Sequence, residues 1–198
     1  MVVPPHHSAA TGFMSKTDLR RQYRAARKAF VASLGAGMRE RLEQALADQV
    51  LPVLAGARLV GSYAAMADEI DPVWIEKRIG PHAFPRVAGP DISFHIAEWR
   101  DMAPGFQGIP EPPATAPAVQ PDVLLVPLLA ATTEGVRLGQ GRGYYDRAIA
   151  RLRQQGKLLA IGLAWDCQIA ASLPADPWDM PLDLVATPTR LVDCRKSR

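Results

Sequence analysis

Cysteine, aromatic residues and long apolar runs are all scarce in this sequence of 198 residues. Only Cys167 and Cys194 occur, and neither has a second Cys or a His at metal-ligand spacing, so we interpret both as reduced thiols. No apolar stretch approaches the length that crosses a membrane, and residues 1–13 lack the continuous apolar run of a secretory segment. We therefore expect a cytoplasmic protein with no membrane partner.

Charge of one sign is not in large excess either. The chain has 23 Lys and Arg residues and 20 Asp and Glu residues, which leaves a formal net charge of +3. Aromatic residues make up 7% of the chain, which gives little support to a basic surface interleaved with aromatic side chains. We expect no nucleic-acid partner, and the slight positive charge suits an anionic small molecule.

The length and composition predict one domain. A hydrophobic fraction of 48% in a chain of this size is enough for a single core. Residues 1–14 show no apolar periodicity and no helix cap, so we predict a disordered extension there and a single domain over residues 15–198. We expect this domain to be a monomer.

Apolar periodicity alternates between helix and strand along the chain. Ser15 and Asp18 have the spacing of a capping box before the first helical pattern. The predicted helices cover about 15–33, 38–52, a segment that begins at 71 and a segment around 145–152; the predicted strands cover 58–63, 92–96, 122–127, 158–163 and 184–187, with another possible near 97–100 in an otherwise irregular segment, 81–121. This order predicts a three-layer α/β fold whose mainly parallel central sheet has helices on both faces.

The first predicted helix carries a basic face. Its cationic side chains are Arg20, Arg21, Arg24, Arg27 and Lys28. Charges on an amphipathic helix usually form a solvated surface, and the alternative is that part of this face points toward a phosphate. The residues themselves leave both interpretations open.

The segment 135–147, GVRLGQGRGYYDR, is the strongest candidate for chemistry. It follows the buried strand 122–127, places Gly139, Gly141 and Gly143 at alternate positions, and leads into a helix. Glycines let backbone N–H groups approach an anion, and a helix start adds unpaired N–H donors. A phosphate cradle is therefore one interpretation, and a plain connecting turn is the other. The segment matches neither the GxGxxG fingerprint nor the Walker loop.

This segment resembles the G-x-R-L-G-x-G-x-G-Y-Y-D motif of the 5-formyltetrahydrofolate cyclo-ligase family, which also follows a strand that ends in proline. The resemblance extends over most of residues 15–188 and keeps the order of the family's motifs. The further matching pieces are Lys16, Leu19 and Arg20; Tyr63, Met66, Glu69 and Ile70; Pro85 and Arg86; Trp99 with residues 108–112; and residues 166–186.

The resemblance implies an ATP- and Mg²⁺-dependent enzyme that converts 5-formyltetrahydrofolate to 5,10-methenyltetrahydrofolate, with ATP and reduced folate as its partners. The formyl oxygen is a poor leaving group, and its phosphorylation would let N10 close the ring. By the resemblance, Arg142 and Tyr144 are catalytic, and ATP is bound by Lys16, Arg20, Arg137, Gly139, Gly141, Arg142, Gly143, Tyr144 and Tyr145.

The resemblance also assigns residues to the metal and to folate. Asp146 and Asp179 would bind Mg²⁺, and the folate site would contain Ala64, Glu69, Trp99 and Tyr144. Each assignment has a structural alternative. Asp146 could complement the helix dipole, Asp179 could cap a turn, and Glu69 could be an exposed acid in a turn. Tyr145 and Trp99 could be ordinary core residues.

The sequence departs from the family pattern at two places. Ala131 and Thr132 stand where the family commonly has Phe-Asp, and Gln140 stands where it often has Arg. The first departure removes any contact that the family's Asp makes. A sugar-phosphate isomerase or CoA-transferase relative, and a catalytically silent nucleotide or folate binder, are the rival hypotheses.

Overall fold

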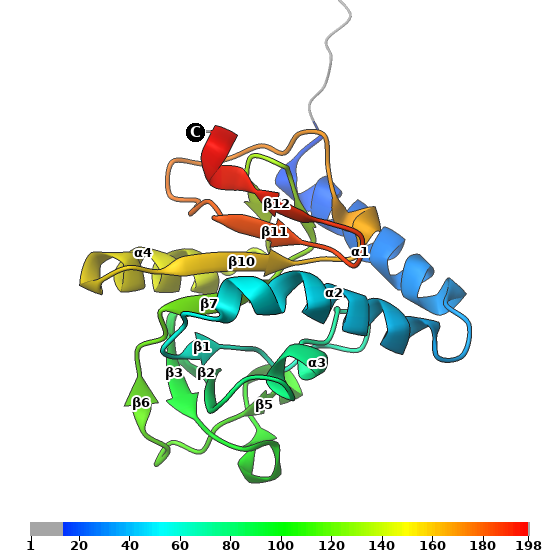
Figure 1. Ribbon diagram of the computed structural model, residues 1–198. Helices are drawn as coiled ribbons and strands as arrows, with labels where there is room; N and C mark the ends of the chain where they lie inside the picture. Colours follow the sequence, from blue (N-terminus) through cyan, green and yellow to red (C-terminus); the bar gives the residue numbers. More distant parts are fainter. Residues whose placement is uncertain (1–13, 198) are drawn as a thin grey trace, which may run out of the picture.

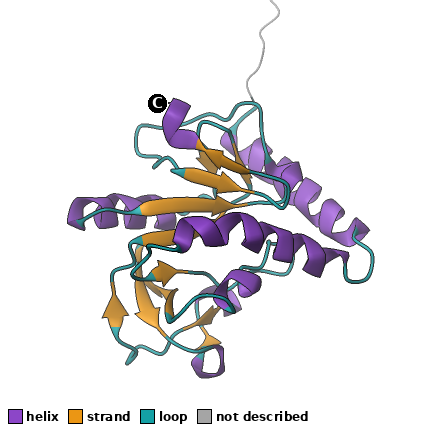
Figure 2. Cartoon of the chain, viewed as in Figure 1, coloured by secondary structure: helices purple, strands orange, loops and turns teal. Residues whose placement is uncertain are grey.

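The computed structural model describes residues 14–197 and forms a three-layer α/β domain (Figures 1 and 2). The predicted extension at 1–14 lies outside the described residues except for Met14, which is exposed. The helices are α1 (Lys16–Ser33), α2 (Met38–Leu54), α3 (Val73–Glu76) and α4 (Tyr144–Gln155). None of the helices within residues 14–197 is long and apolar enough to span a membrane.

The central sheet has the strand order β12-β11-β10-β7-β1-β2-β3-β6. Its strands are β1 (Val60–Gly61), β2 (His82–Ala88), β3 (Asp91–Ile96), β6 (Ala118–Val119), β7 (Val123–Pro127), β10 (Leu159–Leu163), β11 (Leu184–Ala186) and β12 (Leu191–Asp193). The run from β11 through β10, β7 and β1 to β2 is parallel, and antiparallel strands close both edges. The predicted mainly parallel sheet is confirmed.

Strand β7 explains why the sheet is covered on both faces. Val123 and Leu125 belong to the apolar cluster that includes α2, whereas Leu124 and Val126 belong to the cluster that includes α4. Successive side chains of a strand point to opposite faces, so a strand with a helix layer on each side must be apolar throughout. The prediction of a central strand at 122–127 is confirmed, since β7 lies between β10 and β1.

The first helix begins where its cap predicts. The Ser15 hydroxyl accepts a hydrogen bond from the Asp18 N–H at 3.1 Å, which satisfies one of the free donors of the first turn. The second helix runs past Pro52, where the sequence predicted its end, to Leu54. Pro52 therefore interrupts only the last turn of α2.

The segment 81–121 was predicted to be largely irregular, and this is wrong for its first part. Strand β2 pairs with β3 from Ala83 to Ala88 as an antiparallel hairpin. Strand β2 contains Pro85, and proline cannot donate to a sheet ladder. It is tolerated because β1 pairs only with His82 and Ala83, so Pro85 has a strand neighbour on one side alone.

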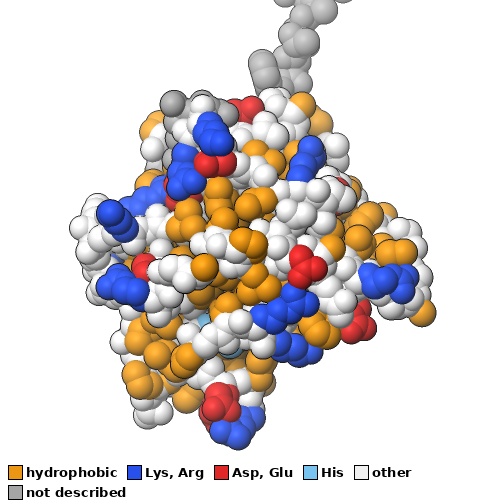
Figure 3. Space-filling view, in the orientation of Figure 1, with side chains coloured by type: hydrophobic (Ala, Val, Ile, Leu, Met, Phe, Trp, Pro, Cys, Tyr) orange, Lys and Arg blue, Asp and Glu red, His pale blue; other side chains and the backbone are white. Residues whose placement is uncertain are grey.

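Two further predictions at the sheet edges need correction. The possible strand near 97–100 is wrong, because Trp99–Asp101 forms a turn of 3-10 helix. The predicted strand 184–187 is not the last, because β12 follows it and pairs antiparallel with β11. On the face seen in Figure 3, Lys and Arg side chains are interspersed with Asp and Glu rather than gathered into one basic block.

Candidate active site

A cavity of about 780 Å³ opens beyond the carboxyl ends of β1 and β7. Tyr63 and Ala64 follow β1, Pro127 and Leu128 end or follow β7, and all four line the cavity. The chain turns from β1 to β2 on one side and from β7 to β10 on the other, so the strand order reverses at this point. Ligand sites of open α/β sheets form at such reversals.

The cavity brings together residues that are far apart in the sequence. Every residue that the family resemblance assigned to ATP, metal or folate lines it, with the exception of Trp99: Lys16, Arg20, Ala64, Glu69, Arg137, Gly139, Gly141, Arg142, Gly143, Tyr144, Tyr145, Asp146 and Asp179. These residues come from α1, from the segment after β1, from the glycine segment and the first turn of α4 that it leads into, and from the segment before β11. Their individual roles stay predictions.

The glycine segment is shaped for a close backbone approach. Gly141 has φ +97° and Gly143, the N-cap of α4, has φ +68°, both in the region that side chains with Cβ resist. The short hairpin β8 (Ala130–Ala131) and β9 (Arg137–Leu138) leads into this loop. No side chain caps the N-terminus of α4, so the free N–H donors of its first turn remain available to an anion.

Thr132 has a structural role in that hairpin. Its hydroxyl accepts hydrogen bonds from the N–H groups of Glu134 and Val136, both at 3.3 Å, and its own N–H donates to Val136 O. Neither Ala131 nor Thr132 lines the cavity. The departure from Phe-Asp therefore leaves a well-formed turn.

A partly buried ion pair supports the first turn of α4. Arg137 Nη2 donates to Asp146 Oδ1 at 2.6 Å, and the Arg137 side chain is only 5% exposed. The same carboxylate oxygen accepts the Met180 N–H at 3.1 Å, which brings the Asp179 segment against α4. Arg137 Nε is buried and has no hydrogen-bond partner among the described residues. A buried polar atom without a partner is rare in native folds, and Arg137 is also one of the residues that line the cavity.

Lys16 joins α1 to the segment before β11. Its Nζ donates to Asp176 Oδ2 at 2.7 Å and to Asp179 Oδ2 at 2.5 Å. Burial favours a lower pKa for Lys16, but the hydrogen bonds and charges of the two carboxylates outweigh it, so the pKa is raised. Burial favours a higher pKa for Asp179, but the Asp176 N–H and Lys16 outweigh it, so that pKa is lowered. Asp179 thus caps a turn, as one interpretation predicted, and also faces the cavity.

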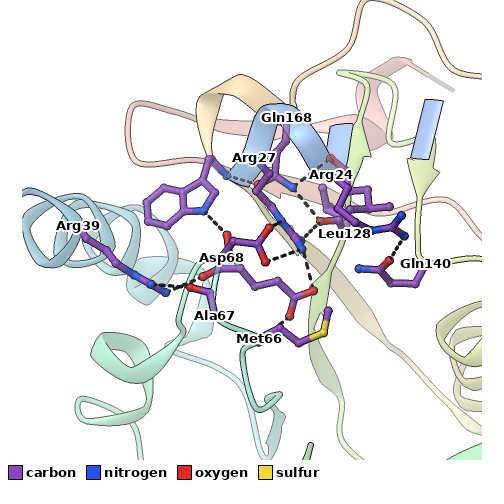
Figure 4. Close-up of polar contacts among 12 residues, drawn as sticks. Arg24, Arg27, Arg39, Met66, Ala67, Asp68, Leu128, Gln140 and Gln168 are labelled. Atoms are coloured by element: carbon purple, nitrogen blue, oxygen red, sulfur yellow. Dashed lines mark hydrogen bonds and ion pairs between the residues drawn. The ribbon is translucent and has the colours of Figure 1, made fainter. Parts of the chain in front are cut away.

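Glu69 is buried, so its interpretation as an exposed acid is wrong. Its Oε2 accepts the Met66 N–H at 3.1 Å, and its Oε1 lies 3.3 Å from Arg27 Nη1. Burial raises the pKa of Glu69, although Met66 N–H and Arg27 oppose the shift. Arg27 is itself buried, which makes the solvated interpretation of the basic helix face wrong at this position (Figure 4).

The solvated interpretation fits only part of the basic face of α1. Arg21 and Lys28 are exposed and do not line the cavity, whereas Arg20, Arg24 and Arg27 line it. Helical periodicity alone could not separate these groups, because the face that meets the cavity depends on how α1 packs.

Aromatic side chains form one wall of the cavity. The Tyr144 and Phe106 rings meet edge to face with centroids 6.1 Å apart, and Arg142 lies over the Phe106 ring at 4.8 Å. Tyr145 packs against the apolar cluster of α4 while also lining the cavity, and burial, aided by the charge of Glu69, raises its pKa. Sequence reasoning missed Phe106 because it lies in a segment without periodic pattern.

Trp99 does not join the site, and its assignment to the folate site is not supported by its position. Its indole N–H donates to Glu76 Oε2 at 3.0 Å and its ring packs edge-on against Phe84, outside the cavity lining. Trp178, which the sequence did not single out, lines the cavity instead and is 71% exposed. Asp176 was also missed, since a single Asp before Pro-Trp carries no distinctive signal.

Asp146 and Asp179 both line the cavity and are the two carboxylates that the family resemblance assigns to a metal. Within the described residues, no three His, Cys, Asp or Glu side chains form a group that could bind a metal by themselves. Mg²⁺ needs only one or two carboxylates when phosphate oxygens and water complete its shell. Asp146 Oδ2 and Asp179 Oδ1 accept no hydrogen bond from the described residues, so each carboxylate keeps one oxygen for a cation.

Known proteins resemble this chain in sequence and in fold. Residues 13–188 match the model of the 5-formyltetrahydrofolate cyclo-ligase family. The chain is 44% identical over 70 residues to 5-formyltetrahydrofolate cyclo-ligase of Escherichia coli (strain K12), an alignment that covers 35% of this chain and 38% of the relative. It is 40% identical over 79 residues to the Haemophilus influenzae protein of the same name, which covers 38% of this chain and 42% of that relative.

The fold is also similar to a solved structure. The NMR structure of Aquifex aeolicus 5,10-methenyltetrahydrofolate synthetase matches with a TM-score of 0.77 and 29% sequence identity, over 93% of this chain and 95% of that one. The family match covers nearly the whole described domain, including α1, the glycine segment and the Asp179 segment. The chain therefore belongs to the 5-formyltetrahydrofolate cyclo-ligase family.

Proposed function

We propose that this protein converts 5-formyltetrahydrofolate to 5,10-methenyltetrahydrofolate at the expense of ATP. The observation that carries the proposal is that one cavity contains both a glycine loop with cationic side chains and a buried carboxylate, Glu69. The first suits a polyphosphate and the second suits a heterocycle with paired N–H donors. Family membership supports the same substrate pair.

The phosphate end of the cavity would be formed by α1 and the glycine segment. Arg20 Nε donates to Gly139 O at 3.0 Å, which keeps an α1 guanidinium beside the loop. Arg137, with one buried nitrogen that lacks a partner, and Arg142 add positive charge. Guanidinium groups that bind phosphate through two hydrogen bonds, together with loop N–H donors, would stabilise the charge of a transferring phosphoryl group more than water does.

The folate end would be formed by Glu69 and the aromatic wall. A carboxylate offers two oxygens to adjacent N–H donors of a pterin, and Ala64 lines the same cavity as Glu69. Tyr144 and Phe106 present ring edges and faces on which a planar heterocycle could pack. Tyr144 lies in both the glycine segment and this wall, so it would contact the formyl group where the two substrates meet.

The chemistry would proceed in two steps. The formyl oxygen attacks the γ-phosphorus, the bond to the β-phosphate oxygen breaks, and ADP leaves. N10 then attacks the formyl carbon, loses its proton as the ring closes, and the C–O bond breaks to release phosphate. Arg142 would neutralise charge on the phosphoryl group, and Tyr144 would hold the formyl oxygen in line.

A divalent cation fits the carboxylates of Asp146 and Asp179. Mg²⁺ bound there would neutralise the β- and γ-phosphate charges of ATP. Lys16, which bonds to Asp176 and Asp179, would share the phosphate charge with the cation. The chain's own contribution would be to hold these carboxylates at the cavity, through Arg137 and the Met180 N–H at Asp146 and through Lys16 and the Asp176 N–H at Asp179.

The test is a spectroscopic assay. Purified protein with Mg²⁺, ATP and 5-formyltetrahydrofolate should generate the near-ultraviolet absorbance of the methenyl product, and a non-hydrolysable ATP analogue should give none. Absence of an ATP-dependent absorbance change at micromolar enzyme would overturn the proposal. Conversion that needs no ATP would instead favour a different mechanism in the same cavity.

A further inference from the structure

Arg27 is a buried arginine that lines the cavity and contacts both the segment after β1 and the segment after β7. Arg27 projects from α1, the helix that also carries Lys16 and Arg20, and is 1% exposed. Its Nε and Nη2 donate to the two carboxylate oxygens of Asp68 at 3.0 and 3.2 Å. Its Nη1 lies 3.3 Å from Glu69 Oε1 and 3.2 Å from Leu128 O (Figure 4).

These contacts fix the orientation of the guanidinium. A buried charge is costly unless it is paired and its hydrogen bonds are satisfied, and here every nitrogen of Arg27 has an acceptor. The fork bonded to Asp68 leaves Nη1 pointing at Glu69. The flat geometry of the group means that this direction cannot change without breaking the bonds to Asp68.

The Glu69 carboxylate is therefore held from two directions. Arg27 contacts Oε1 and the Met66 N–H contacts Oε2, at 3.3 and 3.1 Å. Each carboxylate oxygen can accept more than one hydrogen bond, so both oxygens keep capacity for a ligand in the cavity. Without Arg27, the carboxylate would be buried with one neutral donor and free to rotate about its last torsion.

We infer that Arg27 is a positioning residue for Glu69: it holds the carboxylate oriented for the N–H donors of the folate. The inference deepens the proposed function and rests on it. Arg27 acts through Glu69 and not on the phosphate end, even though it shares a helix with Lys16. Its loss should consequently affect folate and leave ATP largely untouched.

Arg39 of α2 provides a matched control. It donates to the main-chain carbonyls of Ala67 and Glu69 at 2.7 and 2.8 Å, and so supports the same turn. It does not contact the Glu69 carboxylate and does not line the cavity. Removing Arg39 loosens the turn, whereas removing Arg27 also releases the side chain.

The experiment compares Arg27→Met, Arg27→Lys and Arg39→Met in the full chain. KM for each substrate and kcat are measured in the methenyl assay, and thermal unfolding is recorded for every variant. Arg27→Met should raise KM for 5-formyltetrahydrofolate about tenfold or more, the loss expected for a charged hydrogen-bonding partner, and change KM for ATP less than about twofold. Arg39→Met should lower thermal stability with both KM values within about twofold of wild type.

Arg27→Lys keeps the charge but replaces the fork with a single ammonium that cannot bond to Asp68 and Glu69 in the same way. It should give an intermediate KM for folate, and it decides the question if Arg27→Met does not fold. The inference is overturned if the Arg27 variants match Arg39→Met, or if KM for ATP rises as much as KM for folate. Direct titration of wild-type protein with 5-formyltetrahydrofolate separates the two claims: no binding by wild type refutes the proposed function itself.

Discussion

Replacing Gly141 with Ala tests the phosphate loop at the point where its backbone is most constrained. Gly141 has φ +97°, and a Cβ there would lie 3.1 Å from Cζ and 3.2 Å from Nε of Arg20. That Nε donates to Gly139 O, so the methyl group pushes on the contact that keeps Arg20 beside the loop. The substitution should therefore both strain the backbone at residue 141 and displace the Arg20 side chain.

The two effects have different sizes and different readouts. A positive φ costs an L-residue about 1–2 kcal/mol, which lowers Tm by about 2–8 °C in a chain of this length. Loss of a charged contact to phosphate costs about 1.5–3 kcal/mol, so KM for ATP should rise about 10- to 150-fold. KM for 5-formyltetrahydrofolate should change little, because Glu69 does not contact Arg20 or Gly141.

Gly89→Ala is the control for backbone strain. Gly89 also has a positive φ, +61°, but a Cβ there meets nothing within 4 Å, and the residue does not line the cavity. Both variants should lose stability in denaturant titrations, and only Gly141→Ala should lose affinity for ATP. Equal KM values for ATP in the two variants would refute the assignment of phosphate binding to this loop.

Three further predictions concern charged groups of the cavity. Asp146→Asn should remove most activity and raise the Mg²⁺ concentration needed for half-maximal rate while the protein stays folded; wild-type turnover would make the metal assignment wrong. Because burial raises the pKa of Glu69, KM for folate should increase as the pH falls toward that pKa, and Glu69→Gln should have a high KM that no longer follows pH in this range. Lys16→Met should weaken ATP binding. The lowered pKa of Asp179 stabilises the folded protein at pH values above the pKa of the unfolded state, and this stability is lost as the pH falls through the pKa of the folded state. Lys16→Met should therefore lose less stability in acid than wild type. Identical acid unfolding of the two proteins would contradict this.

The parallel strands of the core could be predicted from the apolar pattern of their own residues. Strand β7 is apolar at every position and was predicted as central, because a strand covered on both faces has no polar side to show. Strand β2 was missed, since Pro85 and Arg86 break the apolar pattern and only the pairing with β3 compensates for them. A hairpin is stabilised by its partner strand, and that contribution is invisible in the strand's own residues.

The residues of the candidate site also divide into those that a local pattern identifies and those that only the fold brings to the cavity. The glycine segment could be recognised because its backbone conformation demands particular residue types at particular spacings. Phe106, Asp176 and Trp178 could not, because each lies in a segment without repeated pattern and reaches the cavity only through the fold. Trp99, which did belong to a recognisable motif, bonds to Glu76 instead.

By itself, the sequence determined the layered α/β architecture and the position of the glycine loop, because periodicity and glycine spacing are local properties. Tertiary structure alone decided the environment of each charge. Arg27 and Arg21 lie on one helix within two turns, yet Arg27 is buried against Asp68 and Glu69 while Arg21 is exposed. Burial depends on how α1 packs over the ends of β1 and β7, and the free energy of a charge depends on that burial.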